Sequence, residues 1–327
     1  MGLLDRSETY KPFHYPEFVQ IAETSEKMHW VEQEVDLTED IRQWNDGSVK
    51  PEEKSLVIEI MKTFTQGDAE VATGYIEHFL PTFKNNEARQ MLLSIAAREG
   101  IHQRAYALFT DTIGLPDDSF RAFLEYESLA EKIESMTDMN MNSHKGIAKS
   151  IARTVLSEGV SLFGAFVMLL NFQRQGKLMG LSKINEWSIK DESLHVEGMV
   201  KLFHQFLIEH PRVVTDELKA DIYQMFRDAV KLEDKFVDLA FEMGDVEGLT
   251  KTEVKEYIRY IADRRLIQLG LKGNYGVKDN PLPWLDWIIS ADNVTNFFEQ
   301  RVADYSAAGL TGSWGWEETP KSNLKDK

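Results

Sequence analysis

The chain has 327 residues, 43% of them hydrophobic and 28% charged, which is the composition of a soluble globular protein with one large domain or two smaller ones. Its formal net charge of −17 at pH 7 argues against nucleic acid or an anionic membrane as its main partner. Because the chain has no cysteine, disulfides, zinc–thiolate sites, iron–sulfur clusters and thiol nucleophiles are all excluded.

Two further features bear on the compartment. The N-terminal stretch MGLLDRSETYKPFHY lacks the basic, apolar and small-residue pattern of a secretory signal. The most apolar run, residues 160–172, is too short and too interrupted to span a bilayer. We therefore expect a cytoplasmic protein that binds neither membrane nor nucleic acid.

Apolar residues recur at helical spacing along most of the chain, and the alternation typical of strands is missing. In chain order, helices are predicted over residues 52–66, 87–113, 119–136, 147–176 and 216–243. Ser119 and Thr215 are predicted to cap the third and fifth of these, and turns are expected at 114–116 and 176–182. The prediction is an all-α protein with about eight or more helices.

Six candidate metal ligands repeat in register along the chain. The motif Glu-x-x-His occurs twice, 93 residues apart, and a single carboxylate precedes the two copies by 31 and 34 residues. The two sets are Asp68, Glu99 and His102, and Glu158, Glu192 and His195. Such a gap accommodates one helix, a turn and part of the return helix. Each residue alone has an ordinary reading, such as an ion pair or a helix cap, but the repeat favours a metal site.

This residue set matches the chemistry of a dinuclear centre. Iron or manganese prefers hard carboxylate oxygens that bridge the two ions, plus one imidazole for each. Ferritin-like bundles supply such a set from four helices, two with a Glu and two with Glu-x-x-His. Glu158 lies in an apolar stretch, where an unpaired carboxylate costs several kcal/mol. We therefore predict a ferritin-like bundle with two transition-metal ions, iron or manganese, in its core. Near Asp68, the residues Glu70, Glu77 and His78 remain alternative ligands.

With these residues in place, the chain resembles the small (β) subunit of class I ribonucleotide reductase from about residue 12 to residue 305. The matching motifs are Asp68, Glu99-x-x-His102 with Tyr106, Glu158, Asp191-Glu192-x-x-His195, Trp30 in WVEQEVDLTED (30–40), and Tyr305 in NFFEQRVADY (296–305). Each motif is short, but together they are specific.

The resemblance implies a role for each of these residues. The six ligand candidates would hold two metal ions that an oxygen species activates, and the oxidising equivalent would be stored at Tyr106 or on the metals. Asp191 would accept hydrogen bonds from His102 and Trp30. Tyr305 would connect this path to the large (α) subunit, which reduces ribonucleoside diphosphates to deoxyribonucleotides. The resemblance also implies a homodimer and the activity of a ribonucleoside-diphosphate reductase β subunit.

One departure from the family concerns the surroundings of the radical tyrosine, which bulky apolar side chains enclose in many members. Leu162 and Phe166 keep this character at two matching positions, whereas Ser188 is small and polar at a third. A more hydrated pocket would shorten the life of a phenoxyl radical. The sequence therefore leaves Tyr106 and the metals as alternative stores, and iron and manganese as alternative metals.

The expected organisation is one ferritin-like domain over residues 1–305 and a flexible, Gly-, Ser- and charge-rich tail over 306–327. The tail would dock the large subunit, with Trp314 and Trp316 as candidate anchors. The rival hypotheses are a ferritin-like oxidase of an organic substrate and a metal-storage or oxygen-scavenging protein. A storage function would not explain why Trp30, Asp191 and Tyr305 occur at the positions of the family's electron relay. The chain has no cysteine and no Walker-type glycine loop. Because ribonucleotide reduction consumes thiols, we expect the nucleotide chemistry to take place on a partner subunit.

Overall fold

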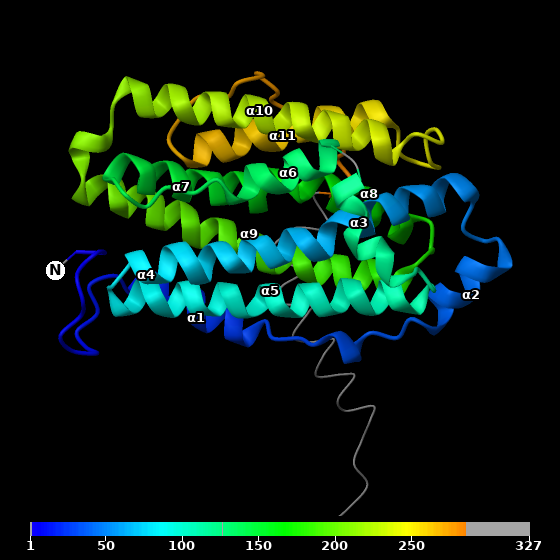
Figure 1. Ribbon diagram of the computed structural model, residues 1–327, viewed down its shortest axis with the longest axis horizontal. Coiled ribbons are helices and arrows are strands. Elements are labelled where there is room, and N and C mark those ends of the chain that lie inside the picture. Colours follow the sequence, from blue (N-terminus) through cyan, green and yellow to red (C-terminus); the bar gives the residue numbers. More distant parts are fainter. Residues whose placement is uncertain (1, 126, 286–327) are drawn as a thin grey trace, which may run out of the picture. The chain divides into compact units, whose positions relative to one another are not determined.

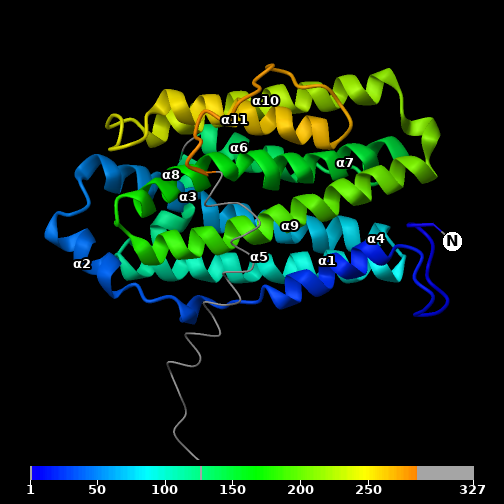
Figure 2. The same cartoon turned by 180° about the vertical axis from the view of Figure 1, so that it is seen from behind.

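The computed structural model describes residues 2–125 and 127–285, without the side chains at 65 and 122–128 (Figures 1 and 2). Every regular element in these residues is helical, and the β pairing found among them is a lone bridge between Val246 and Leu249. The all-α prediction is confirmed. The predicted boundary at 305/306 lies outside the described residues.

The first part of the chain builds two long antiparallel helices and the short elements that precede them. These elements are α1 (Pro16–Lys27), the 3₁₀ turn η1 (Glu32–Glu34), α2 (Thr38–Asp46), α3 (Pro51–Gly74), the π turn η2 (Tyr75–Phe79), α4 (Leu80–Thr82) and α5 (Asn86–Thr112). Pro16 and Pro51 begin α1 and α3, where a missing backbone N–H costs nothing. Asn85 caps α5, because its side chain accepts the Ala88 N–H at 3.0 Å.

The predicted helix over 119–136 is two elements, the 3₁₀ helix η3 (Asp117–Glu125) and α6 (Glu127–Thr137). Ser119 is therefore wrong as a helix cap. Its N–H donates to the Pro116 carbonyl at 2.8 Å, so the chain is already coiled in a tight turn before Ser119 is reached.

The next helical stretch is the most apolar in the protein. It consists of α7 (His144–Leu156), the π turn η4 (Ser157–Ser161) and α8 (Phe163–Arg174). By length and composition alone, His144–Arg174 is a helix that could cross a membrane, and its most apolar window is 100% buried inside the protein. A buried core helix has the same properties, and this stretch lies within the bundle (Figure 1).

The last described helices are α9 (Met179–Glu209), the 3₁₀ turn η5 (Pro211–Val213), α10 (Asp216–Ala240) and α11 (Lys251–Gln268). Thr215 caps α10 as predicted, with its hydroxyl accepting the Leu218 N–H at 3.2 Å. The turn expected at 176–182 is shorter, since positive φ angles at Gly176 and Leu178 reverse the chain and α9 begins at Met179.

Four long helical segments form the core: α3, α5, α7–α8 and α9 (Figures 1 and 2). Helix α5 packs against α3 and α9, and α9 also packs against α7 and α8. Helix α1 lies on α5 and α9, whereas α10 and α11 form a further layer beside α7 and α8. Helix α6 contacts both α3 and α10. The predicted ligands therefore lie on the four segments that face one another.

Candidate metal centre

The six predicted ligands meet in the middle of the bundle. Their exposed fractions lie between 0% and 3%. By element, they are Asp68 on α3, Glu99 and His102 on α5, Glu158 in η4, and Glu192 and His195 on α9. The alternatives near Asp68 lie elsewhere: Glu77 is exposed, His78 is half-buried, and Glu70 accepts a hydrogen bond from Gln66.

Two glutamates each face both imidazoles. Glu99 Oε2 is 3.4 Å from His102 Nδ1, and Glu99 Oε1 is 3.0 Å from His195 Nδ1. Glu192 Oε1 is 3.2 Å from His102 Nδ1, and Glu192 Oε2 is 3.4 Å from His195 Nδ1. A carboxylate with one oxygen toward each of two imidazoles is the arrangement of a ligand that bridges two ions.

The donor atoms separate into two overlapping groups. One contains Asp68, Glu99 and His102, and the other contains Glu99, Glu158, Glu192 and His195; within each group the donor atoms lie within 4.8 Å of one another. Such clusters fit two cations that share Glu99. The four carboxylates also balance the charge of two divalent ions.

The hydrogen bonding of these donors tests whether the cluster suits metal ions. Among the described residues, no partner in hydrogen-bond geometry exists for Asp68 Oδ2, Glu158 Oε2, either oxygen of Glu99 and Glu192, or either ring nitrogen of His195. Buried polar atoms are almost always paired, because each unpaired one costs about 1–3 kcal/mol. A concentration of them at one point fits a site whose partners are cations.

The pKa values of three carboxyl groups in the cluster differ strongly from their ordinary values. Burial, reinforced by the charge of Glu99, raises the pKa of Asp68 well above its ordinary value. Burial and the charge of Glu192 do the same to the pKa of Glu158. Burial alone would also raise the pKa of Glu99, but the two adjacent imidazoles lower it to about 2.

The pKa values of the two imidazoles are raised, so both favour the protonated form. Burial alone would lower the pKa of each, but the carboxylates around them outweigh it. The pKa of His195 is raised to about 10, chiefly by Glu192 and Glu99. The pKa of His102 is raised by Asp191, Glu192 and Glu99. Without metal, protons therefore take the place of cations in this cluster.

Asp191 joins the cluster to Trp30 through a single oxygen. Trp30 Nε1 donates to Asp191 Oδ2 at 2.8 Å, and His102 Nε2 lies 3.1 Å from the same oxygen. Because His102 Nδ1 faces the carboxylates, Nε2 carries the proton that Asp191 accepts. The rings of Trp30 and His102 stack at 5.9 Å between centroids. The structure thus brings together the three residues that the sequence predicted to interact.

Tyr106 is buried beside this cluster. Its ring packs edge-on against Phe64 at 4.7 Å, and Phe64 in turn contacts Phe166 at 5.3 Å. Leu162 and Ser188 are buried as well. Burial, followed by the charge of Asp68, raises the pKa of the Tyr106 phenol well above its ordinary value. Phe64 was not predicted, although its place four residues before Asp68 puts both on one face of α3.

Three further predicted residues, Tyr305, Trp314 and Trp316, lie outside the described residues.

The model of the family "Ribonucleotide reductase, small chain" matches residues 7–281 of this sequence. The chain belongs to the ribonucleotide reductase small-chain family. This small subunit is 37% identical to the probable ribonucleoside-diphosphate reductase small subunit of invertebrate iridescent virus 3, over 96% of this chain and 88% of the relative. Members of the family generate a radical and act with a large subunit, and that is the function of this chain.

Solved structures show the same fold. The ribonucleotide reductase R2 subunit from Clostridium botulinum has a TM-score of 0.80 at 21% identity, over 86% of this chain and 91% of that one. The dimanganese(II)-NrdF of Streptococcus sanguinis has a TM-score of 0.77 at 18% identity, over 88% of this chain and 100% of that one. The ferritin-like class predicted for the small subunit is thereby confirmed.

Two residues that hydrogen-bond to carboxylates of the candidate centre were not predicted from the sequence. The Tyr75 hydroxyl donates to Glu158 Oε1 at 2.6 Å, and the pair is fully buried. Arg98 donates to Asp191 Oδ2 from Nη2 at 2.8 Å and from Nε at 3.1 Å. Helical spacing offers a signal for both: Tyr75 lies seven residues after Asp68, and Arg98 lies four residues before His102.

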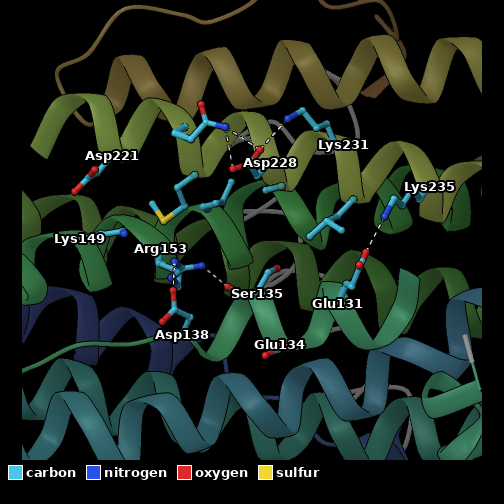
Figure 3. A pocket seen from close by; sticks show the side chains of 15 residues that line it. Glu131, Glu134, Ser135, Asp138, Lys149, Arg153, Asp221, Asp228, Lys231 and Lys235 are labelled. Carbon is cyan, nitrogen blue, oxygen red and sulfur yellow. Dashed lines mark hydrogen bonds and ion pairs between the residues drawn. The ribbon is translucent and has the colours of Figure 1, made fainter. Parts of the chain in front are cut away.

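The small subunit also has a surface groove (Figure 3). It has a volume of about 650 Å³, and residues of α6, α7 and α10, with Asp138, line it. Its wall combines apolar side chains such as Leu156 and Met225 with ion pairs, Lys235 with Glu131 and Arg153 with Asp138. None of the six ligand positions contributes to this wall.

We predict that metal loading of the small subunit releases protons. His102 and His195 have raised pKa values and are protonated near pH 7 in the metal-free protein, whereas metal ligands must be deprotonated. Addition of Mn²⁺ should release at least about two protons per chain, and affinity should fall from about pH 8 to about pH 6. An indicator dye in weak buffer measures the release, with metal-loaded protein as the control. Loading without proton release would contradict this assignment.

Proposed function

We propose that this small subunit holds two iron or manganese ions and sends an oxidising equivalent along Trp30 and Tyr305 to its large subunit. The ions would bind to Asp68, Glu99, His102, Glu158, Glu192 and His195. The observation that carries the proposal is the single buried cluster in which these donors meet and in which Asp191 links one imidazole to Trp30.

The geometry suggests how the ligands are divided. When bound, the ions supply the one-electron oxidising chemistry of the centre. Glu99 and Glu192 would bridge them, since each faces both imidazoles. Asp68 would serve the ion on the His102 side, and Glu158 the ion on the His195 side. The hydrogen bond from Tyr75 keeps one oxygen of Glu158 in place.

Tyr106 is one of two proposed stores for the oxidising equivalent. Its buried phenol has a pKa far above neutrality, so it stays protonated until it is oxidised, and oxidation must then release the proton. The charge of Asp68 acts most strongly on this phenol, and no hydrogen-bond partner for the Tyr106 hydroxyl is found among the described residues. The apolar rings of Phe64 and Phe166 support a long-lived radical, whereas buried Ser188 favours storage on the metals.

The relay begins at His102 and Trp30. When an electron leaves buried Trp30, its indole proton can move 2.8 Å to Asp191 Oδ2 and return with the electron. Arg98 holds the same oxygen with two N–H groups, which favours the ionised carboxylate. Burial raises the pKa of Asp191, but His102 and Arg98 outweigh it and lower the pKa below its ordinary value. Asp191 is thus ionised at neutral pH, with the indole N–H of Trp30 on one of its oxygens.

We extend the proposal to assembly and location. The subunit would act as a homodimer, as the resemblance implies, and in the cytoplasm, as expected from its composition. Residues 306–327 would dock the large subunit, with Trp314 and Trp316 as anchors. Iron and manganese both suit the carboxylate-rich ligand set, and the Streptococcus sanguinis protein of the same fold is a dimanganese protein.

The ligand assignment predicts the metal content of a double variant. The unaltered subunit should bind two ions per chain after reconstitution. Glu158→Ala combined with Glu192→Ala should bind fewer than two, because one bridging and one terminal carboxylate are lost. Elemental analysis of the desalted protein measures the content. Glu197→Ala with Glu217→Ala, at exposed positions of α9 and α10, is the matched control. Full loading of the double variant would refute the assignment.

Electron paramagnetic resonance separates the two proposed stores. If Tyr106 holds the equivalent, the oxidised subunit shows a tyrosyl signal, and Tyr106→Phe loses both this signal and nucleotide reduction. If the metals hold it, the oxidised subunit shows a metal signal and Tyr106→Phe keeps its activity. Tyr10→Phe, at an exposed tyrosine, is the control for either case. A tyrosyl signal that persists in Tyr106→Phe would place the radical on another tyrosine.

The relay assignment predicts the phenotype of Tyr305→Phe. Phenylalanine has no hydroxyl to oxidise at the potential of tyrosine, so nucleotide reduction with the large subunit should fall to background. Metal content and the oxidised spectrum should stay unchanged, because the substitution lies outside the ligand set. Activity assays with added large subunit, together with metal analysis, test this. Retention of activity would exclude Tyr305 from the path.

A further inference from the structure

The element that carries Glu158 is a π-helical turn, η4. The Leu162 N–H donates to the Ser157 carbonyl, five residues back, at 3.2 Å. Such turns interrupt the regular hydrogen bonding of a helix and occur often at functional sites. Since the regular helical hydrogen bonding is interrupted here, contacts from other elements contribute to fixing the backbone around Glu158.

Two buried cations hold two carbonyl oxygens of this turn. Lys132 Nζ donates to the Ser161 carbonyl at 2.9 Å, and Arg265 Nε donates to the Gly159 carbonyl at 3.1 Å. Lys132 comes from α6 and Arg265 from α11, both outside the four core segments. A hydrogen bond from a charged donor is worth about 1.5–3 kcal/mol, roughly twice a neutral one.

Lys132 belongs to a closed arrangement. It is 3% exposed, pairs with Glu233 Oε2 of α10 at 3.0 Å, and lies 4.1 Å from the centre of the Phe236 ring. Burying such a pair gains little stability over apolar residues, since desolvation offsets the attraction. Its placement on the Ser161 carbonyl is better explained by the control of local geometry.

Arg265 fits against the turn because residue 159 is glycine. A Cβ at Gly159 would come within 2.7 Å of Arg265 Nε and 3.0 Å of Arg265 Cδ, so any side chain there would displace the guanidinium. Arg265 also lies 5.0 Å from the centre of the Phe163 ring and donates to Gln268 Oε1 at 2.9 Å. The turn and the arginine are thus matched in shape.

We propose that Lys132 and Arg265 are positioning residues for Glu158, which hold η4 so that this carboxylate is aimed at the metal centre before any ion binds. The proposal rests on the metal centre proposed above. Tyr75 fixes the carboxylate itself, and the two cations fix the backbone next to it. Together they restrict both ends of the Glu158 side chain.

Two variants test the proposal in the full-length subunit. Arg265→Met removes one donor and keeps the length of the side chain. Lys132→Met is combined with Glu233→Met, because Lys132→Met alone would leave a buried unpaired carboxylate. Titration with Mn²⁺, followed by electron paramagnetic resonance, should show one ion bound nearly as in the unaltered subunit. The ion beside Glu158 should bind about 10–100-fold more weakly. Hydrogen exchange of amides 158–162 should accelerate in the metal-free protein.

Matched controls lie on the same helices. Arg259→Met removes the ion pair between Arg259 and Asp234, which joins α11 to α10 at the surface. Lys235→Met with Glu131→Met removes the pair that joins α10 to α6 in the wall of the groove (Figure 3). Both controls should bind two ions with unchanged affinity and exchange amides 158–162 at the normal rate.

The outcomes separate the two proposals. If the unaltered subunit binds fewer than two ions, the metal centre itself is wrong. If it binds two ions and the folded variants bind both equally well, the positioning role is wrong, even where thermal stability has fallen. Weaker binding of one ion, with faster exchange confined to the turn and a native far-ultraviolet circular dichroism spectrum, supports the proposal.

Discussion

The burial of four carboxylates and two imidazoles at one point is the constraint on which the rest of the structure depends. Charged groups cannot enter an apolar core unless opposite charge accompanies them. The shifted pKa values of Asp68, Glu158 and the two histidines show how the metal-free protein meets this requirement, with protons in place of cations. Two divalent ions would meet it more completely, because they neutralise four carboxylates and give the unpaired donor atoms a partner. Long helices suit this task, since their backbone groups are satisfied internally and leave the core to the side chains.

Helix α9 carries both candidate metal ligands and the carboxylate that contacts Trp30. Successive residues of a helix point about 100° apart. Glu192 and His195 therefore face the carboxylate cluster, while Asp191 faces away from it toward Trp30. His102 completes the link from α5, with one ring nitrogen on each side. Trp30, in the segment between α1 and η1, is thus linked through one carboxylate oxygen to a candidate metal ligand on a helix.

The sequence was sufficient to predict the helices and the ligand motifs, which depend on spacing along one helix. It was insufficient to predict hydrogen bonds between residues of different helices. Glu99-x-x-His102 and its second copy follow from spacing alone, and so did the long helices. Arg98 and Tyr75 find their partners 93 and 83 residues away, and only the folded bundle reveals these contacts. The π turn at Glu158 has no spacing signal either, because its register results from packing against other helices. Ser119 was misassigned because the tight turn after Pro116 begins before the apolar periodicity does.

A dinuclear site of this kind needs only four helical segments, so the remaining described elements require a reason of their own. The segment between α1 and η1 supplies Trp30, which donates to the Asp191 oxygen that also lies beside His102. The layer of α6, α10 and α11 supplies Lys132 and Arg265, which donate to backbone carbonyls beside Glu158, and Glu233, which pairs with Lys132. General packing would be served as well by apolar residues at these positions, which cost less to bury. The hydrogen bonds to the Ser161 and Gly159 carbonyls instead fix the backbone of η4. If the Glu158 carboxylate moved, the ion proposed to bind beside it would be held more weakly. On the positioning role proposed for Lys132 and Arg265, the layers outside the bundle would serve the centre as well as the stability of the fold.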